Sequence, residues 1–264
     1  MNEKVTHATP AALYAKTAHR DWECDMLTPA GARDIAFQLV ETVRGRNIDV
    51  VLGGGRAAFT PISEVRERDL EEFNCSRKDN VDLVSRWKSL HPRGSFLASK
   101  SDLLRVDPSK TDSLLGLFSW SHIPYDDELS FQGEAPSLLN MTSTALNFLL
   151  SRSEDRGFFL MVEGGRIDHA NHLAQAHRAL SETVAMDRAV EEILRQVNLE
   201  ETLIIVTADH SHTLAISGYP GRTADITGVS RGDGGWVMKG EDNQPMSILG
   251  YVGLENINLN LLSN

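Results

Sequence analysis

Apolar residues recur at helical spacing in several segments of the chain, each of which is predicted to form an amphipathic helix. The stripes in residues 136–151 and 171–197 are the longest. A shorter helix is expected over residues 10–19, opened by Thr9 with Pro10 in its first turn, where proline is tolerated. The remaining predicted helices cover residues 80–90 and a stretch that begins at Thr28 and Pro29 and carries an apolar face to Val43.

Three short and mostly apolar runs, at residues 48–52, 157–163 and 202–207, predict buried strands. The last two runs flank the long predicted helix at 171–197, so they read as a strand–helix–strand unit with parallel pairing. Ligands in open α/β sheets bind beyond the carboxyl ends of the strands. Polar residues at those two ends are therefore the candidates for chemistry.

Each of these two runs is followed by an Asp and a His. Asp168 and His172 are four positions apart and would share a face on a helical turn. Asp209 and His210 are adjacent, and Glu163 ends the run at 157–163. A single Asp/His pair is more often a surface turn or a helix cap, but two pairs at successive strand ends favour a metal site. Such oxygen and nitrogen donors suit zinc, and a lone carboxylate suits magnesium.

The glycine run Gly53-Gly54-Gly55 before Arg56 suggests a phosphate loop. It lacks the Gly-Lys-Ser/Thr ending of such loops, so a tight turn after a strand is the better interpretation. The formal net charge of −11 over 264 residues argues against nucleic acid as a partner, because phosphate backbones require basic patches. Acidity also fits a chain that holds several divalent cations.

Composition also bears on location. No apolar run reaches the length of a membrane helix, and the first residues lack the apolar core of a signal peptide. Cys24 and Cys75 could form a disulfide or remain two free thiols. The tripeptides at 74–76 and 140–142 match the N-glycosylation acceptor pattern, which favours secretion only weakly.

The segment Val162 to His172 resembles the E-G-x-x-I-D-x-x-x-H element of alkaline phosphatases, and Thr207 to His212 resembles that family's T-A-D-H-S-H element. Further matches occur in the family's order and cover about nine-tenths of the chain. They are Val5 to Ala11, His19 to Trp22, Leu52 to Arg56, Leu114 to Phe118, Pro136 to Leu138 and Gly218 to Pro220.

The resemblance implies three metal sites with carboxylate, imidazole and hydroxyl ligands: Asp168 and His172 for a first zinc, Asp209 and His210 for a second zinc, and Thr9 and Glu163 for magnesium. It also implies that Arg20 clamps the phosphate, a task that suits the two-pronged guanidinium. His7 and His169 would lie beside the magnesium and the phosphate, which is the animal-type pattern.

The fold implied is α/β, a central, mostly parallel β-sheet flanked by helices on both faces in an incomplete three-layer sandwich. Residues 1–251 would be one partial domain and 252–264 a divergent tail. The implied activity is hydrolysis of phosphate monoesters with two Zn²⁺ ions and one Mg²⁺ through a phosphoserine. A homodimer, an extracellular or cell-surface location and a lipid anchor to the membrane in the full-length protein are likewise expectations from the family.

The chain departs from the family pattern at both ends. The nucleophilic serine and a bridging aspartate would lie upstream of Val5, and the third histidine of the first zinc would lie downstream of Tyr251. A partial chain is therefore expected. The alternatives are a catalytically silent metal- or phosphate-binding relative, and a phosphodiesterase or sulfatase of the same fold. The presence of Arg20, Thr9 and Glu163 together favours the monoesterase.

Overall fold

The computed structural model describes residues 3–64, 75, 77–129, 134–152, 156–232 and 234–251. It divides into two compact units, Met1–Gly165 with Val184–Leu199, and Arg166–Thr183 with Glu200–Asn264. The single domain expected over residues 1–251 stays a prediction. The tail expected at 252–264 lies outside the described residues.

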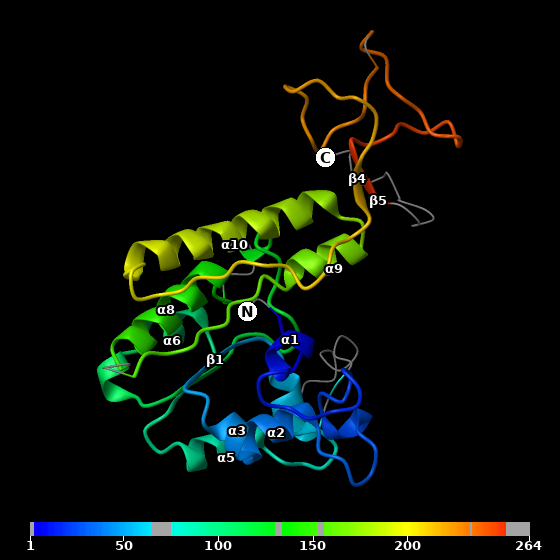
Figure 1. Ribbon diagram of the computed structural model, residues 1–264. Helices are drawn as coiled ribbons and strands as arrows, with labels where there is room; N and C mark the ends of the chain where they lie inside the picture. The colour runs from blue at the N-terminus through cyan, green and yellow to red at the C-terminus, as the bar shows by residue number, and fades with distance from the viewer. Residues whose placement is uncertain are drawn as a thin grey trace. The chain divides into compact units, whose positions relative to one another are not determined.

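The first unit holds most of the regular structure (Figure 1). Its elements are α1 (Ala8–Ala11), η1 (Asp25–Leu27), α2 (Ile35–Glu41), α3 (Val43–Arg46), β1 (Val50–Gly53), η2 (Arg56–Phe59), η3 (Ile62–Glu64), α5 (Leu83–Leu90), β2 (Ser95–Leu97), α6 (Lys100–Arg105), η4 (Pro108–Lys110), β3 (Leu114–Leu117) and α8 (Leu138–Leu150). The second unit contains α9 (Arg166–His172), β4 (Leu214–Ile216) and β5 (Leu249–Tyr251). Helix α10 (Ala176–Gln196) contributes residues to both units.

A parallel sheet in the order β1-β3-β2 forms the centre of the first unit. Because side chains alternate along a strand, β3 contributes side chains to two hydrophobic cores, one on each face of the sheet. Leu115 lies in a core with residues of α2 and α5, whereas Leu114 lies in a second core with residues of α6 and α8. Helices thus cover both faces of the sheet, as Figure 1 shows. The predicted fold class, a parallel sheet between two helical layers, is confirmed.

Side-chain caps explain where the best-predicted helices begin. Ser137 forms a capping box with Asn140 at the start of α8, and the side chain of Asp82 accepts the amide of Ser85 at the start of α5. Such caps satisfy amides that have no partner within the helix. The predictions of helices at 136–151 and 80–90 are confirmed within a few residues. Because Asn140 belongs to its capping box and Thr142 is buried, the glycosylation pattern at 140–142 lies within a packed helix.

Two helix predictions near the start of the chain were wrong in extent. The helix expected over 10–19 is the single turn α1, followed by turns and irregular backbone. The helix expected from Pro29 begins only at Ile35, where Asp34 accepts the amide of Phe37. Gly31 lies before it with a φ of +88°. Tertiary contacts, described below with the site, hold residues 16–33 in this irregular path.

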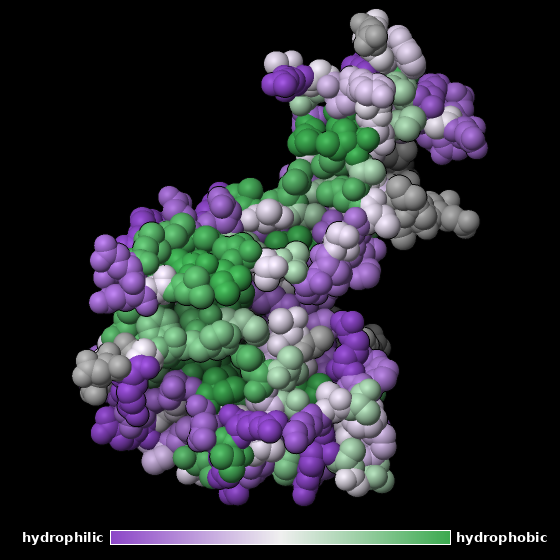
Figure 2. Space-filling model, in the orientation of Figure 1, coloured by the Kyte–Doolittle hydropathy of each residue, from purple (hydrophilic) through white to green (hydrophobic). Residues whose placement is uncertain are grey.

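The apolar runs at 157–163 and 202–207 are not strands, so the predicted strand–helix–strand unit was wrong. Among the described residues, no strand pairs with either run. A strand is stable only when a neighbour satisfies its backbone groups, and periodicity cannot report that neighbour. Phe159, Leu203 and Ile205 are 78%, 84% and 75% exposed. Figure 2 shows apolar residues over broad areas of the surface.

The helix predicted over 171–197 is interrupted. Helix α9 ends at His172 and α10 begins at Ala176, and between them Ala174 adopts a left-handed φ of +54°. The parallel strands β2 and β3 were not predicted. β2 is only three residues long, and the sequence offers no alternation over so short a stretch.

Cys24 and Cys75 form a disulfide with a Cα–Cα distance of 6.0 Å, which resolves the choice that the sequence left open. Nearby, the fully buried guanidinium of Arg77 donates to both carboxylate oxygens of Asp34, at 3.1 and 3.2 Å, and to the carbonyl of Ala58 at 3.2 Å. No helix among the described residues is both long and apolar enough to cross a membrane.

Candidate metal centre

Helix α9 places Asp168 and His172 on one face of the second unit. The two residues lie one turn apart, as the spacing predicted, and Nε2 of His172 is 3.5 Å from Oδ1 of Asp168. The hydroxyl of Tyr251 donates to Oδ1 of Asn171 at 2.6 Å, which ties this helix to β5 of the same unit. The Asp168 carboxylate is thus held on an anchored element.

The segment that follows the apolar run at 202–207 brings two more imidazoles to the same carboxylate. Nε2 of His212 lies 2.7 Å from Oδ1 of Asp168, and Nε2 of His210 lies 3.6 Å from it. Potential ligand atoms of Asp168, His172 and His212 all lie within 4.8 Å of one another. One carboxylate and several imidazoles are a donor set that suits zinc.

His212 is the site residue that the sequence reasoning missed. It was part of the matched element but received no role. The signal was present, because in extended backbone the residues at i and i+2 face the same side. His210 and His212 therefore approach one carboxylate together. Their ring centroids are 5.2 Å apart.

The structure does not separate the pair predicted for a second zinc from the pair predicted for the first. Asp209 is largely exposed, and its Oδ2 is 3.3 Å from Nε2 of His210, which also lies near Asp168. The pKa of His210 is raised, first by its hydrogen bond to the carbonyl of Ser211 and then by the charges of Asp209 and Asp168. A proton and a metal ion would therefore compete for this imidazole.

In the first unit the structure brings Thr9 and Glu163 together. Burial and the negative charge of Glu3 raise the pKa of the Glu163 carboxyl, while a hydrogen bond with the Thr9 side chain lowers it. A hydroxyl beside two carboxylates is an oxygen-only donor set, which fits a hard cation such as magnesium. The charge of a cation would also relieve the repulsion between the two carboxylates.

Arg20 and His7, predicted near the phosphate, contact each other. Nη2 of Arg20 lies 3.1 Å from Nε2 of His7, and Nδ1 of His7 lies 2.8 Å from Oε1 of Glu3. The ring of His7 meets that of His122 edge to face, with centroids 5.3 Å apart. His169 lies on α9 of the second unit, where its Nδ1 is 2.9 Å from Nη1 of Arg166.

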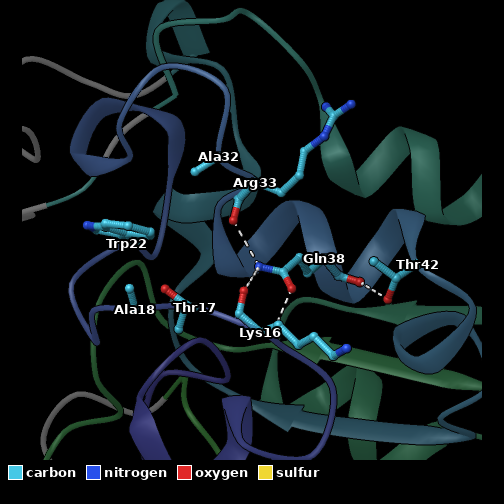
Figure 3. Close-up of a pocket in the computed structure, with 8 residues that line it drawn as sticks. All are labelled: Lys16, Thr17, Ala18, Trp22, Ala32, Arg33, Gln38 and Thr42. Atoms are coloured by element: carbon cyan, nitrogen blue, oxygen red, sulfur yellow. Dashed lines mark hydrogen bonds between the residues drawn. The ribbon is translucent and has the colours of Figure 1, made fainter.

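The irregular segment that carries Arg20 is fixed by the side chain of Gln38. Its Oε1 accepts the amide of Lys16 at 2.7 Å, and its Nε2 donates to the carbonyls of Lys16 and Arg33, at 3.0 and 2.8 Å. Figure 3 shows these bonds beside an open pocket of about 550 Å³, with Trp22 also on its wall. The bonds explain why residues after α1 leave the helical path.

Comparison with known proteins identifies the class. The sequence model of the alkaline phosphatase family, described as "Alkaline phosphatase", matches residues 2–257. The chain belongs to the alkaline phosphatase family. Two similar solved structures agree with the fold. The crystal structure of Thermus thermophilus alkaline phosphatase is 32% identical with a TM-score of 0.56, covering 74% of this chain and 34% of that one.

The second structure is a TAB5 alkaline phosphatase variant with Mg bound in its M3 site. It is 22% identical with a TM-score of 0.60, covers 95% of this chain and 59% of that one, and supports the fold alone. Among curated proteins, alkaline phosphatase 4 of Drosophila melanogaster is 41% identical over 92% of this chain and 41% of its own length. The human tissue-nonspecific isozyme is 39% identical over 94% of this chain and 47% of its own length. The chain thus spans less than half of each of these two relatives.

Proposed function

We propose that this chain supplies the metal ligands and the phosphate clamp of an alkaline phosphatase that hydrolyses phosphate monoesters. The observation that carries the proposal is the gathering of His172, His210 and His212 around Oδ1 of Asp168. Family membership supports the proposal, because the family model covers the segments that carry these residues.

The proposed metals follow the donor types. Asp168 and His172 bind a first zinc, Asp209 and His210 a second zinc, and Thr9 and Glu163 bind magnesium. His212 keeps the Asp168 carboxylate oriented through its 2.7 Å contact. Zinc at such a site supplies Lewis-acid stabilisation of charge on the phosphate and alcohol oxygens.

The protein's own residues bind and orient the ester. The planar guanidinium of Arg20 matches two phosphate oxygens and is exposed in the first unit, where a substrate can reach it. His7 holds one edge of that guanidinium. His169 is proposed to lie beside the bound phosphate and magnesium. For the whole protein the proposal includes a serine that attacks phosphorus, expels the alcohol and becomes a phosphoserine, which water then hydrolyses.

We further propose an extracellular or cell-surface location. The Cys24–Cys75 disulfide supports it, because disulfides persist in oxidising compartments. A relative from Bombyx mori, 40% identical over 86% of this chain and 42% of its own length, is named membrane-bound alkaline phosphatase. A homodimer and a lipid anchor remain proposals that rest on the resemblance to the family.

Zinc titration by calorimetry tests the metal ligands directly. Asp168→Asn should lower zinc affinity by about a hundredfold, because it removes the carboxylate charge at the centre of the histidine group. Asp242→Asn, a matched change at an exposed turn of the same unit, should bind zinc as the parent does. Equal zinc affinity in the two variants would contradict the assignment.

Turnover of p-nitrophenyl phosphate by the whole protein at alkaline pH, with zinc and magnesium present, tests the activity. Release of p-nitrophenol that is lost in Arg20→Ala would support the phosphatase. Zinc binding by the whole protein, without any turnover above the blank, would instead identify a silent metal-binding relative.

A further inference from the structure

Glu3 is a buried carboxylate beside the proposed phosphate clamp, and its negative charge also acts on the nearby Glu163. Its relative exposure is 4%. Its Oε1 lies 2.8 Å from Nδ1 of His7, which is four positions further along the chain. Burying a carboxylate destabilises the protein unless the carboxylate accepts a hydrogen bond. The contact with His7 supplies such a bond and therefore couples Glu3 to the imidazole.

The contact of the other ring nitrogen of His7 indicates its tautomer. Nε2 lies 3.1 Å from Nη2 of Arg20. A guanidinium can only donate hydrogen bonds, so Nε2 must accept and carries no proton. The ring proton of a neutral His7 therefore sits on Nδ1 and is donated to Glu3. Glu3, His7 and Arg20 form one directed chain of hydrogen bonds from a carboxylate to a guanidinium.

The backbone around Glu3 holds its side chain in place. The Glu3 carbonyl accepts the amide of Gly54 at 2.7 Å, and Lys4 forms a parallel bridge with Gly54. Gly165 leaves room for the carboxylate: a Cβ there would lie 2.3 Å from Cγ of Glu3 and 2.5 Å from its Cδ. The side chain thus occupies space that only a glycine at 165 leaves open.

We propose that Glu3 is a positioning residue for the phosphate clamp: it fixes His7 as the Nδ1–H tautomer, and His7 then holds one edge of the Arg20 guanidinium. The remaining N–H groups of Arg20 stay available for phosphate oxygens. This proposal rests on the proposed function of Arg20. Arg20 contacts the phosphate in this proposal, whereas Glu3 acts on Arg20 through His7.

Nitrogen-15 NMR of histidine-labelled protein tests the tautomer without any ligand. In the parent, Nδ1 of His7 should be protonated and Nε2 should not. In Glu3→Gln the amide can donate or accept, so both tautomers should become populated. Affinity for inorganic phosphate, measured by calorimetry, should fall by about three- to tenfold, as expected for one indirect hydrogen bond. Glu3→Asp, which keeps the charge, should restore part of both signals.

A matched control separates positioning from folding. Glu23 is also buried, but its carboxylate bonds the Lys4 and Thr6 side chains. Glu23→Gln should lower stability and leave the His7 tautomer unchanged. If Glu3→Gln does not fold, Gly165→Ala displaces the Glu3 side chain instead and should give the same mixture of tautomers.

A single unchanged His7 tautomer in folded Glu3→Gln would overturn the proposal, as would unchanged phosphate affinity. The parent protein could bind no phosphate while its His7 tautomer still responds to Glu3→Gln. That result would contradict the role of Arg20 and would still support the control of His7 by Glu3. The two failures are therefore distinguishable.

Discussion

Nε2 of His212 lies 2.7 Å from Oδ1 of Asp168, although the two residues are 44 positions apart in the chain. His172, only four positions from Asp168, lies further from the same oxygen, at 3.5 Å. The tighter contact therefore comes from the fold and not from the helical repeat. It holds the carboxylate in one orientation, and the ring of His172 meets that of His212 edge to face, with centroids 4.9 Å apart.

Removing His212 should weaken zinc binding in the second unit. We expect His212→Ala to lower zinc affinity by roughly ten- to a hundredfold, the range seen when a residue that orients a metal ligand is lost. Competition with a coloured chelator measures it. His19→Ala, which changes an exposed histidine paired with Asp21, is the control and should bind zinc normally. Equal affinities would show that His212 does not support the site.

Zinc affinity should rise with pH through the raised pKa of His210. The neighbouring Ser211 carbonyl and the Asp209 and Asp168 carboxylates favour the protonated ring, and zinc requires the neutral one. Below that pKa, affinity should increase by up to about tenfold per pH unit for each proton displaced. Calorimetry in buffers of different ionisation enthalpy counts those protons, and His210→Ala should release one fewer.

Without metal, the raised pKa of His210 should make the folded state less stable as pH rises, whereas zinc affinity rises with pH. The folded state binds the proton on His210 more tightly than the unfolded chain does. Its contribution is therefore fully present below the unfolded pKa and is lost as pH rises through the raised folded pKa. A metal-free stability that instead rose through this range because of His210 would contradict the assignment. The comparison with His210→Ala isolates that contribution.

The disulfide should make a large contribution to the stability of the first unit. It closes a loop with a sequence separation of 51 residues. The loop-closure model then gives about 4 kcal/mol. Cys24→Ser, Cys75→Ser and the double variant should all lose about this amount in urea unfolding, and dithiothreitol should reduce the parent to the same level. An additive loss in the double variant would indicate that the cysteines act separately.

Arg77 and Arg86 form a matched pair of ion-pair tests. Arg77→Met leaves the Asp34 carboxylate buried without its cation and should cost about 3–5 kcal/mol in urea unfolding. Arg86→Met removes a bridge to Glu41 in which the arginine side chain is 51% exposed, and should cost under about 1 kcal/mol. Similar losses of unfolding free energy in the two variants would mean that burial does not determine how much these ion pairs stabilise the protein.

Helices with strong local signals could be predicted from the sequence. Ser137 with Asn140 and Asp82 with Ser85 are start signals that lie within a few residues of the helices they open. The path of residues 16–33 could not be predicted in this way. It depends on Gln38, whose side chain bonds backbone groups of Lys16 and Arg33 that local periodicity does not identify.

The candidate site likewise has features that the sequence could predict and contacts that it could not. The four-residue spacing of Asp168 and His172 predicted a shared helical face, and α9 provides it. The contacts of His212 with Asp168 and of Glu3 with His7 could not be read from spacing, because a hydrogen bond between segments depends on how the chain folds back. The apolar runs ending at Glu163 and Thr207 predicted strands, but pairing needs a partner that a run of apolar residues does not specify.

The sequence by itself determined the family, the parallel α/β class and the kinds of ligand, because these depend on ordered motifs and on the chemistry of each side chain. The tertiary structure decided which oxygen the three histidines share, which tautomer His7 adopts and that Cys24 pairs with Cys75. Each of these depends on distances of a few ångström between residues that lie far apart or in separate turns of the chain, and only packing fixes such distances.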